Sequence, residues 1–407
     1  MEKAKAYLYT ERAHYMCPNM HFGIMLRIAD TFDLPKMQAS LAALTAAHPF
    51  LRSLIAEETG TGKLYYAPKE NLLPSVIVKE TAANWQQDYD EISCAGWNVH
   101  QECLLKTIAY PDEQGFSLLL IAHHLLCDGR GLLQLAEEFA QHYKNGVPPQ
   151  YAEEKLIASL QDLPANSDLP WISKVIIGDA NKKWKKEQHK VPYETYLAFE
   201  KKYIRENPVQ RDLTVVEGEA LKEIQDLCHR EKVSVNDYLI AKMMLEENTG
   251  KVLIAEDIRS MISCWQQGAI GNYSTAFGVV VKKKATDIAS LAKQVRAVVQ
   301  DITTHPKKEM LVLACYLRMN PDLLDAVAIA TLGDFQSASG KFVGSNMFGF
   351  AAQAGFSITN LGKITSDAID SAFFIPPASP ANRKIWGVLT VNDKMTICTA
   401  AAKKQQP

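Results

Sequence analysis

The chain has 407 residues and a formal net charge of −2, with 47% hydrophobic and 22% charged residues. This is the composition of a globular protein that buries a core without disulfides or structural metals. It lacks the basic excess of nucleic-acid-binding proteins, so we expect no nucleic acid partner. The eight cysteines are scattered without a Cys-x-x-Cys pair, which predicts reduced thiols.

The sequence predicts neither a leader nor a membrane span. Residues 1–5 read Met-Glu-Lys-Ala-Lys, a charged start unlike the apolar core of a signal peptide. The longest apolar runs, such as residues 310–317, are too short to span a bilayer. We therefore expect a cytoplasmic protein. Separately, we expect it to be a monomer.

The first part of the chain predicts alternating strands and helices, the pattern of an α/β fold. The near-continuous apolar run at residues 116–124 is typical of a buried central strand. Capping residues and prolines mark the helix ends. In chain order we expect strands at 19–29, 63–67, 75–79 and 116–124, with one helix from Asp33 to before Pro49 and another from Asp128 to about Gly146.

Residues 161–192 break this pattern, with three prolines and the basic cluster Lys182-Lys183-Trp184-Lys185-Lys186. We expect a crossover there, and we predict an N-terminal lobe at 1–165, a linker at 166–191 and a C-terminal lobe at 192–407. In the second lobe we expect strands at 193–202, 213–216, 251–255, 275–282 and 355–360. We expect helices at 219–230, 234–250, 287–302 and 310–330. A loop is expected at 335–353, and a hairpin at 385–400 that turns at Asn392-Asp393.

The strongest chemical signal is a pair of histidines at the end of the long apolar strand. His123 and His124 are followed by Asp128 and Gly129, where a helix is expected to begin. Neighbouring residues of a strand point to opposite faces, so only one histidine can face a given cleft. This argues against a His-His metal clamp, and no His-Glu-x-x-His group is present, so we predict no metal.

The segment His123-His124-Leu125-Leu126-Cys127-Asp128-Gly129 resembles the His-His-x-x-x-Asp-Gly signature of an acyltransferase superfamily. That superfamily includes chloramphenicol acetyltransferase and the condensation domains of nonribosomal peptide synthetases. Weaker matches lie elsewhere in the chain, in the order that the superfamily's motifs have. They are His48-Pro49-Phe50-Leu51-Arg52, residues 233–241, Asp257-Ile258-Arg259, Ile270-Gly271-Asn272-Tyr273 and Ser357-Ile358-Thr359-Asn360-Leu361-Gly362. The Asp-Phe-Gly-Trp-Gly motif of the plant branch is absent from these 407 residues, and we expect no fused carrier-protein segment.

The resemblance implies two chloramphenicol acetyltransferase-like lobes in a V-shaped arrangement, with the active site in a tunnel between them. It implies that His124 is the general base, and that Asp128 and Gly129 complete the catalytic motif. An imidazole has an ordinary pKa near 6.5 and can both accept and return a proton at neutral pH. The amide at the start of the helix after Asp128 is the expected oxyanion donor.

Other residues receive supporting roles from the resemblance. Asp128 is expected to pair with Arg259 from the other lobe, and His123 is expected to be structural because it faces away from the cleft. Ser357, Thr359 and Asn360 are expected to line the substrate tunnel. Cys127 is interpreted as a packing residue, since the family forms no covalent cysteine intermediate.

The resemblance implies an acyltransferase that uses a thioester co-substrate and no permanently bound cofactor. The donor is either acyl-coenzyme A or a phosphopantetheinyl carrier protein, and the acceptor is a small molecule with a hydroxyl or amine. Two alternatives remain open: an amide-forming condensation enzyme of secondary metabolism, and a non-catalytic binding module on the same fold. The basic residues at 182–190 and 282–284 form either a solvated surface or a contact for phosphates or an acidic carrier protein.

Overall fold

The computed structural model describes residues 5–187 and 190–403. Residues 1–4, on which the expectation of no signal peptide partly rests, and residues 188–189 of the basic run lie outside this description. Within it, no helix combines the length and apolar character needed to cross a membrane.

The first lobe is built on a five-stranded sheet in the order β12-β2-β7-β6-β5. A separate three-stranded sheet, in the order β1-β4-β3, lies beside it. The strands are β1 (Ala6–Tyr7), β2 (His21–Ile28), β3 (Ser53–Glu57), β4 (Leu64–Pro68), β5 (Val76–Val78), β6 (Leu105–Asp112), β7 (Gly115–His123) and β12 (Ser371–Ile375). The helices of this part are α1 (Arg12–Tyr15), α2 (Leu34–Ala47), α3 (Trp85–Ala95) and α4 (Gly129–Asn145).

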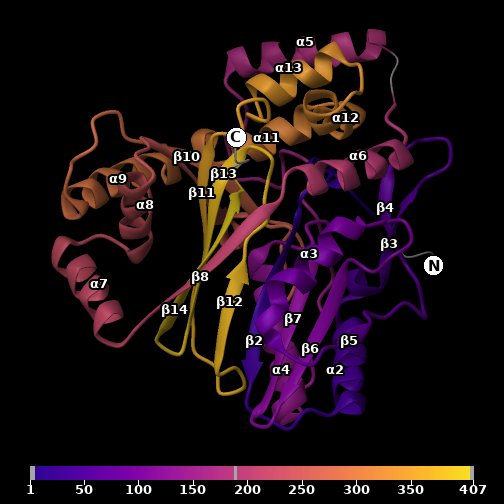
Figure 1. Ribbon diagram of the computed structural model, residues 1–407. Coiled ribbons are helices and arrows are strands. Elements are labelled where there is room, and N and C mark those ends of the chain that lie inside the picture. Colours follow the sequence, from indigo (N-terminus) through magenta and orange to yellow (C-terminus); the bar gives the residue numbers. More distant parts are fainter. Residues whose placement is uncertain (1–4, 188–189, 404–407) are drawn as a thin grey trace.

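The second lobe is built on a six-stranded sheet in the order β10-β9-β11-β13-β14-β8. Helices α7, α8 and α9 lie together at the outer side of this sheet, on the left of Figure 1. The strands are β8 (Val209–Glu217), β9 (Lys251–Asp257), β10 (Ser274–Val280), β11 (Gly355–Ile364), β13 (Asn382–Val391) and β14 (Lys394–Ala402), and the helices are α7 (Gly218–Glu231), α8 (Val235–Glu246) and α9 (Ile288–Thr303).

A layer of helices covers one end of both sheets, at the top of Figure 1. Its members are α5 (Trp171–Glu187), α11 (Leu311–Arg318), α12 (Pro321–Leu332) and α13 (Ala338–Asn346). Helix α6 (Tyr193–Glu206) contacts α3, and α10 (Pro306–Glu309) contacts α9 and α11. Three short 3₁₀ turns complete the description, at Pro49–Arg52, Ala82–Asn84 and Arg259–Met261. The two-lobed α/β fold expected from the sequence is present; its V shape and tunnel stay predictions.

The buried strand β7 is confirmed as the centre of the first sheet. It pairs antiparallel with β2 on one side and with β6 on the other. Its side chains from Leu118 to Ala122 are at most 1% exposed. The sheet also contains β12 from the C-terminal part of the chain, which pairs with β2. The C-terminal part of the chain therefore contributes one strand to the sheet of the first lobe, while the boundaries at 165 and 192 stay predictions.

Four expectations are corrected by the structure. Residues 193–202 are helical, because the buried side chains Tyr196, Leu197, Glu200, Tyr203 and Ile204 recur at helical spacing. The helix expected at 310–330 is two helices, because Asn320 caps a new one that begins at Pro321. The expected linker contains the helix α5, and the expected loop at 335–353 contains α13.

The sequence of α13 looked like a loop because it contains glycine and serine. A side chain at Gly344 would collide with the Thr331 side chain of α12, and one at Gly340 would come within 2.9 Å of Ala330. These glycines therefore allow α12 and α13 to approach closely.

Candidate active site

The candidate site forms where β7 ends and α4 begins. The His124 amide still donates to the Met20 carbonyl across the sheet at 2.8 Å. The chain then turns, and the Asp128 side chain accepts from the Gly131 amide at 2.9 Å, which caps α4 as predicted. A buried sheet and a capped helix thus fix both ends of the motif.

His123 and His124 lie on opposite sides of the chain, as the strand geometry requires. The His123 ring packs against Trp97, with 5.9 Å between ring centroids, and its Nδ1 accepts from the Leu125 amide at 3.2 Å. Burial lowers the pKa of His123 to about 3, so this imidazole stays neutral. His124 instead lines a pocket that His123 does not reach.

Asn272 holds His124 through two hydrogen bonds. Its Nδ2 donates to the His124 carbonyl at 2.8 Å, which leaves its Oδ1 facing His124 Nδ1 at 3.0 Å. Because an amide oxygen can only accept, Nδ1 must carry the proton. Nε2 is then the basic nitrogen that is available to the pocket.

Burial lowers the pKa of His124 below its ordinary value of 6.5, against the opposing influences of Asn272 and the Asp128 charge. The imidazole of His124 is therefore neutral near pH 7 and able to accept a proton.

A second imidazole stacks on His124. The rings of His14 and His124 have centroids 4.2 Å apart and an interplanar angle of 16°. Burial, followed by the neighbouring His124 and His123, lowers the pKa of His14 well below its ordinary value. The short helix α1 that carries His14 is tied to α12 by Arg12, whose Nε donates to Asp325 Oδ1 at 3.0 Å. This neutral ring restricts the orientation of His124 without adding charge.

The Asp128 carboxylate is 3% exposed and accepts hydrogen bonds from both halves of the chain. Besides capping α4, Oδ1 accepts from Arg259 Nη2 at 2.8 Å, and Oδ2 accepts from the Tyr273 amide at 2.8 Å. The predicted Asp128–Arg259 ion pair is therefore present. Arg259 also donates through Nη1 to Asp257 Oδ1 at 3.0 Å.

Two glycines allow this close meeting of the halves. A side chain at Gly129 would come within 2.7 Å of Leu361 Cδ2. A side chain at Gly131 would collide with the Ile270 carbonyl oxygen. Gly131 thus permits the segment that carries Asn272 and Tyr273 to lie against the start of α4.

The pocket beside His124 has a volume of about 270 Å³. Thr359 and Asn360 line this pocket, whereas Ser357, earlier on β11, does not. Their role in a substrate tunnel stays a prediction. The lining side chains combine an apolar side with hydrogen-bonding and acidic groups; its residues are Phe22, His124, Asp128, Gly129, Arg130, Asn236, Ala255, Glu256, Asp257, Ser274, Thr359, Asn360, Leu361, Gly362, Phe374 and Pro377.

Cys127 is fully buried beside the motif, and burial raises the pKa of its thiol well above the ordinary value. A neutral thiol is a poor nucleophile, in agreement with the packing role predicted for it. Within residues 5–187 and 190–403, no group of three or more His, Cys, Asp or Glu side chains is placed to hold a metal. Metal independence stays a prediction.

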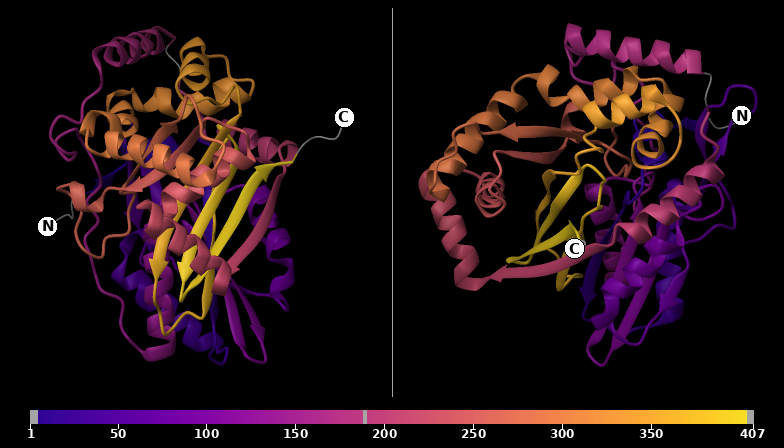
Figure 2. Two further views of the ribbon diagram at one scale, coloured as in Figure 1. Left: turned by 90° about the vertical axis from the view of Figure 1, so that its left-hand side faces the viewer. Right: turned by 45° about the horizontal axis from the view of Figure 1, so that its top comes forward.

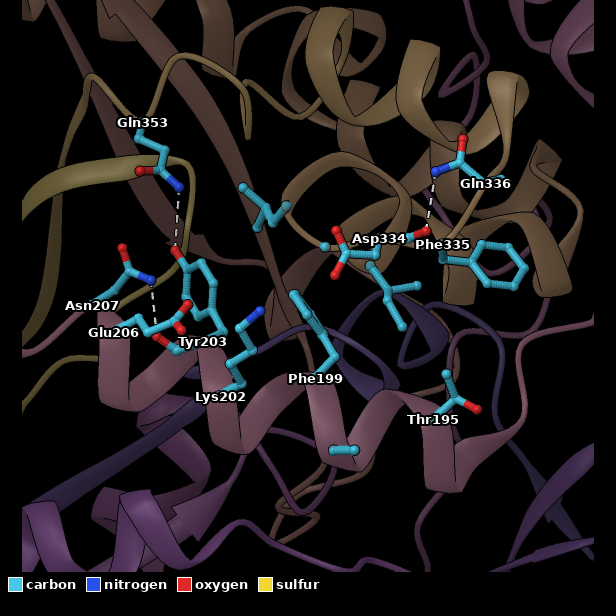
Figure 3. A pocket seen from close by; sticks show the side chains of 14 residues that line it. Thr195, Phe199, Lys202, Tyr203, Glu206, Asn207, Asp334, Phe335, Gln336 and Gln353 are labelled. Atoms are coloured by element: carbon cyan, nitrogen blue, oxygen red, sulfur yellow. Dashed lines mark hydrogen bonds between the residues drawn. The ribbon is translucent and has the colours of Figure 1, made fainter.

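A larger hollow of about 650 Å³ lies between α6 and the end of α12, away from all the predicted site residues (Figure 3). Phe199 and Tyr203 project from α6 into it, and Gln353 donates to the Tyr203 hydroxyl at 3.3 Å. Lys202, Glu206 and Asp334 line it, but it contains no histidine or cysteine and so offers neither an imidazole nor a thiol.

Sequence reasoning assigned no role to Asn272, His14 or Gly131. Asn272 belongs to the segment Ile270-Gly271-Asn272-Tyr273, which resembles a motif of the superfamily, and that resemblance could have indicated a role for it. Gly131 follows Gly129 at a helix start, which is a weak hint of close packing. Nothing in the local sequence around His14 indicates that its ring lies on His124.

Comparison with solved structures shows the fold of the condensation domains. Polyketide synthase associated protein 5 from Mycobacterium tuberculosis is 14% identical, with a TM-score of 0.58 over 99% of this chain and 93% of that chain. The first condensation domain of the CDA synthetase is 11% identical, with a TM-score of 0.59 over 100% and 92%. The epimerization domain from the third module of tyrocidine synthetase B is 16% identical, with a TM-score of 0.55 over 99% and 92%. No protein-family model and no curated protein matches the sequence.

The Asp128–Arg259 pair should couple the stability of the two halves. We expect Asp128→Ala and Arg259→Ala each to lower the free energy of unfolding, by up to about 3–5 kcal/mol, because each removes the oppositely charged partner of a buried group. Asp257 still pairs with Arg259 in Asp128→Ala, so that variant should lose less than the full amount. The double variant should lose less than the sum of the two single losses. Chemical denaturation of all four proteins measures the coupling, and simple additivity would contradict direct pairing.

The contact between Asn272 and His124 should be visible in the pH dependence of activity. His124 acts as a base only when neutral, so wild-type activity should persist below pH 6.5 and fall through the lowered pKa of His124. Asn272→Asp places a carboxylate beside Nδ1 and stabilises the imidazolium. It should move the acidic limb of kcat/KM upward by about one pH unit or more.

The matched control is Asn236→Asp, which adds a carboxylate to the same pocket without direct contact to His124 Nδ1. The acidic limb of kcat/KM should move less in Asn236→Asp than in Asn272→Asp. Equal shifts in the two variants would argue against the hydrogen bond as the cause.

Proposed function

We propose that this chain is an acyltransferase, which moves an acyl group from a thioester to a hydroxyl or amine with His124 as general base. One observation carries the proposal: the tautomer of His124 is fixed by Asn272, which leaves a basic Nε2 available to a pocket between the two lobes. A packed structural histidine such as His123 has no such access.

The acceptor would bind with its hydroxyl or amine hydrogen toward His124 Nε2. As the acceptor oxygen or nitrogen attacks the thioester carbonyl, its proton passes to Nε2 and a tetrahedral oxyanion forms. Collapse of this intermediate breaks the C–S bond, and the imidazolium returns the proton to the leaving sulfur. The product is an ester or amide together with a free thiol, and His124 is again neutral.

The start of α4 is the proposed oxyanion stabiliser. This helix has 17 residues and begins at Gly129, which lines the pocket. The amides of its first turn and its dipole favour negative charge at that end. Asp128 and Arg259 neutralise each other and hold the helix start in place, so we assign them positioning roles.

The donor is proposed to be acyl-coenzyme A or a carrier-protein thioester. The shared condensation-domain fold supports the carrier-protein alternative, in which the product is an amide. A non-catalytic binding module is disfavoured by the intact contacts of Asp128 with Arg259 and of His124 with Asn272. A binding module that has lost its catalytic activity does not need these contacts to hold the His124 ring in position.

The test is turnover by wild-type protein and His124→Ala with acetyl-coenzyme A, longer acyl-coenzymes A and acyl-loaded carrier proteins, each with hydroxyl and amine acceptors. His124→Ala should lower kcat by about 10²–10⁴-fold, because general-base catalysis is lost, while the melting temperature changes little.

Cys127→Ala is the matched control within the same motif. It should retain a substantial fraction of activity, and no acylated protein should appear in the mass spectrum after incubation with donor alone. A His124→Ala variant with near-normal kcat would refute the general-base assignment.

A further inference from the structure

Helix α5 carries a group of exposed apolar side chains far from the candidate active site. Trp171 is 76% exposed, Ile172 64% and Val175 52%. Ile176 on the same helix and Phe342 on the neighbouring α13 are also exposed, at 38% and 47%. We call these five residues the α5 patch. Single exposed apolar residues are ordinary, but a contiguous group of this size indicates an interaction surface.

The α5 patch is left over after α5 has packed on the protein. The inner face of the helix is formed by Ile177, Ala180 and Trp184, which are at most 3% exposed. These residues recur at three- and four-residue spacing, and the patch residues of α5 occupy other sides of the helix. α5 lies at the outer edge of the molecule in all three views (Figures 1 and 2), so its free side meets the surroundings.

The helix that carries this apolar surface has an excess of lysines. α5 contains five lysines and two acidic residues, although the whole chain has a formal net charge of −2. Lys174 pairs with Asp168 and Lys183 pairs with Asp179 at 2.8 Å. Lys174, Asp179 and Lys182 line a hollow of about 570 Å³ together with Trp171, Val175 and Phe342. Exposed Lys341 adjoins Phe342 in the sequence of α13.

We propose that the α5 patch binds the protein peripherally to an anionic phospholipid membrane. The tryptophan and aliphatic side chains would enter the interfacial region, where apolar surface leaves water. The long lysine side chains would keep their ammonium groups at the level of the lipid phosphates. The inference does not depend on acyl-transfer chemistry.

The observations favour a lipid surface over a second copy of this chain. A second copy of this chain would bring one lysine-rich surface against another, and like charges oppose that contact. The combination of tryptophan and aliphatic residues with flanking lysines, on a helix at the edge of the molecule, suits a planar interface of negative charge.

Cosedimentation of the full chain with lipid vesicles tests the proposal. We expect binding to vesicles of phosphatidylcholine and phosphatidylglycerol at low ionic strength, weak binding to phosphatidylcholine alone, and release in about 0.5 M salt. Trp171→Ser combined with Ile172→Ser should weaken the partition constant about tenfold or more. Lys182→Glu combined with Lys183→Glu should weaken it by a similar factor.

Two matched controls separate the α5 patch from general surface effects. Leu73→Ser with Val147→Ser removes apolar residues that are 51% and 50% exposed elsewhere, and Lys282→Glu with Lys283→Glu changes lysines at another site. Both should bind nearly as wild type does. Circular dichroism should show unchanged folding, because every changed position is exposed.

Absence of binding to anionic vesicles would overturn the proposal, as would equal losses in the control variants. Light scattering that shows a dimer lost only in Trp171→Ser with Ile172→Ser would overturn it in favour of self-association.

Discussion

The Asp128 carboxylate is the point at which the two halves of this protein are joined at the candidate site. From its own half it accepts the Gly131 amide and thereby begins α4. From the other half it accepts Arg259 and the Tyr273 amide. A buried carboxylate needs such partners, because its desolvation is otherwise unfavourable by several kcal/mol. The need of the buried Asp128 carboxylate for hydrogen-bond donors therefore brings the two halves together at the candidate site.

The consequence for His124 comes through Asn272, which lies next to Tyr273 in the sequence. Once the Tyr273 amide is bound to Asp128, the Asn272 side chain reaches both the carbonyl and the ring of His124. Glu154 holds the same segment from the other side, since it accepts from the Ile270 amide at 2.7 Å. The tautomer of the proposed base is thus fixed by a segment almost 150 residues away along the chain.

Local sequence signals predicted those features that depend on local physics. The apolar run of β7, the capping by Asp33 and Asp128, and the hairpin turn at Asn392-Asp393 were all readable because neighbouring residues determine them. The Asp128–Arg259 pair came from a resemblance and not from spacing, because its members are 131 residues apart.

The errors have a common physical origin in packing between distant segments. Residues 193–202 contain aromatic residues that suit a strand, but their buried face has helical spacing. The glycines of α13 suggest a loop until α12 is placed against them. The stacking of His14 on His124 depends on α1 being tied to α12 through Arg12 and Asp325. The last two contacts leave no periodic trace in one segment.

The protonation of the His124 ring is the most direct test of this account. Nitrogen-15 NMR of histidine-labelled protein, with the His124 signals identified by their loss in His124→Gln, distinguishes the two neutral tautomers. The structure predicts a proton on Nδ1 and an unprotonated Nε2 at neutral pH, with a mixture of tautomers in Asn272→Ala. A proton on Nε2 in the wild-type protein would contradict the account, because the proposed basic nitrogen of His124 would then have no lone pair to take the proton of the acyl acceptor.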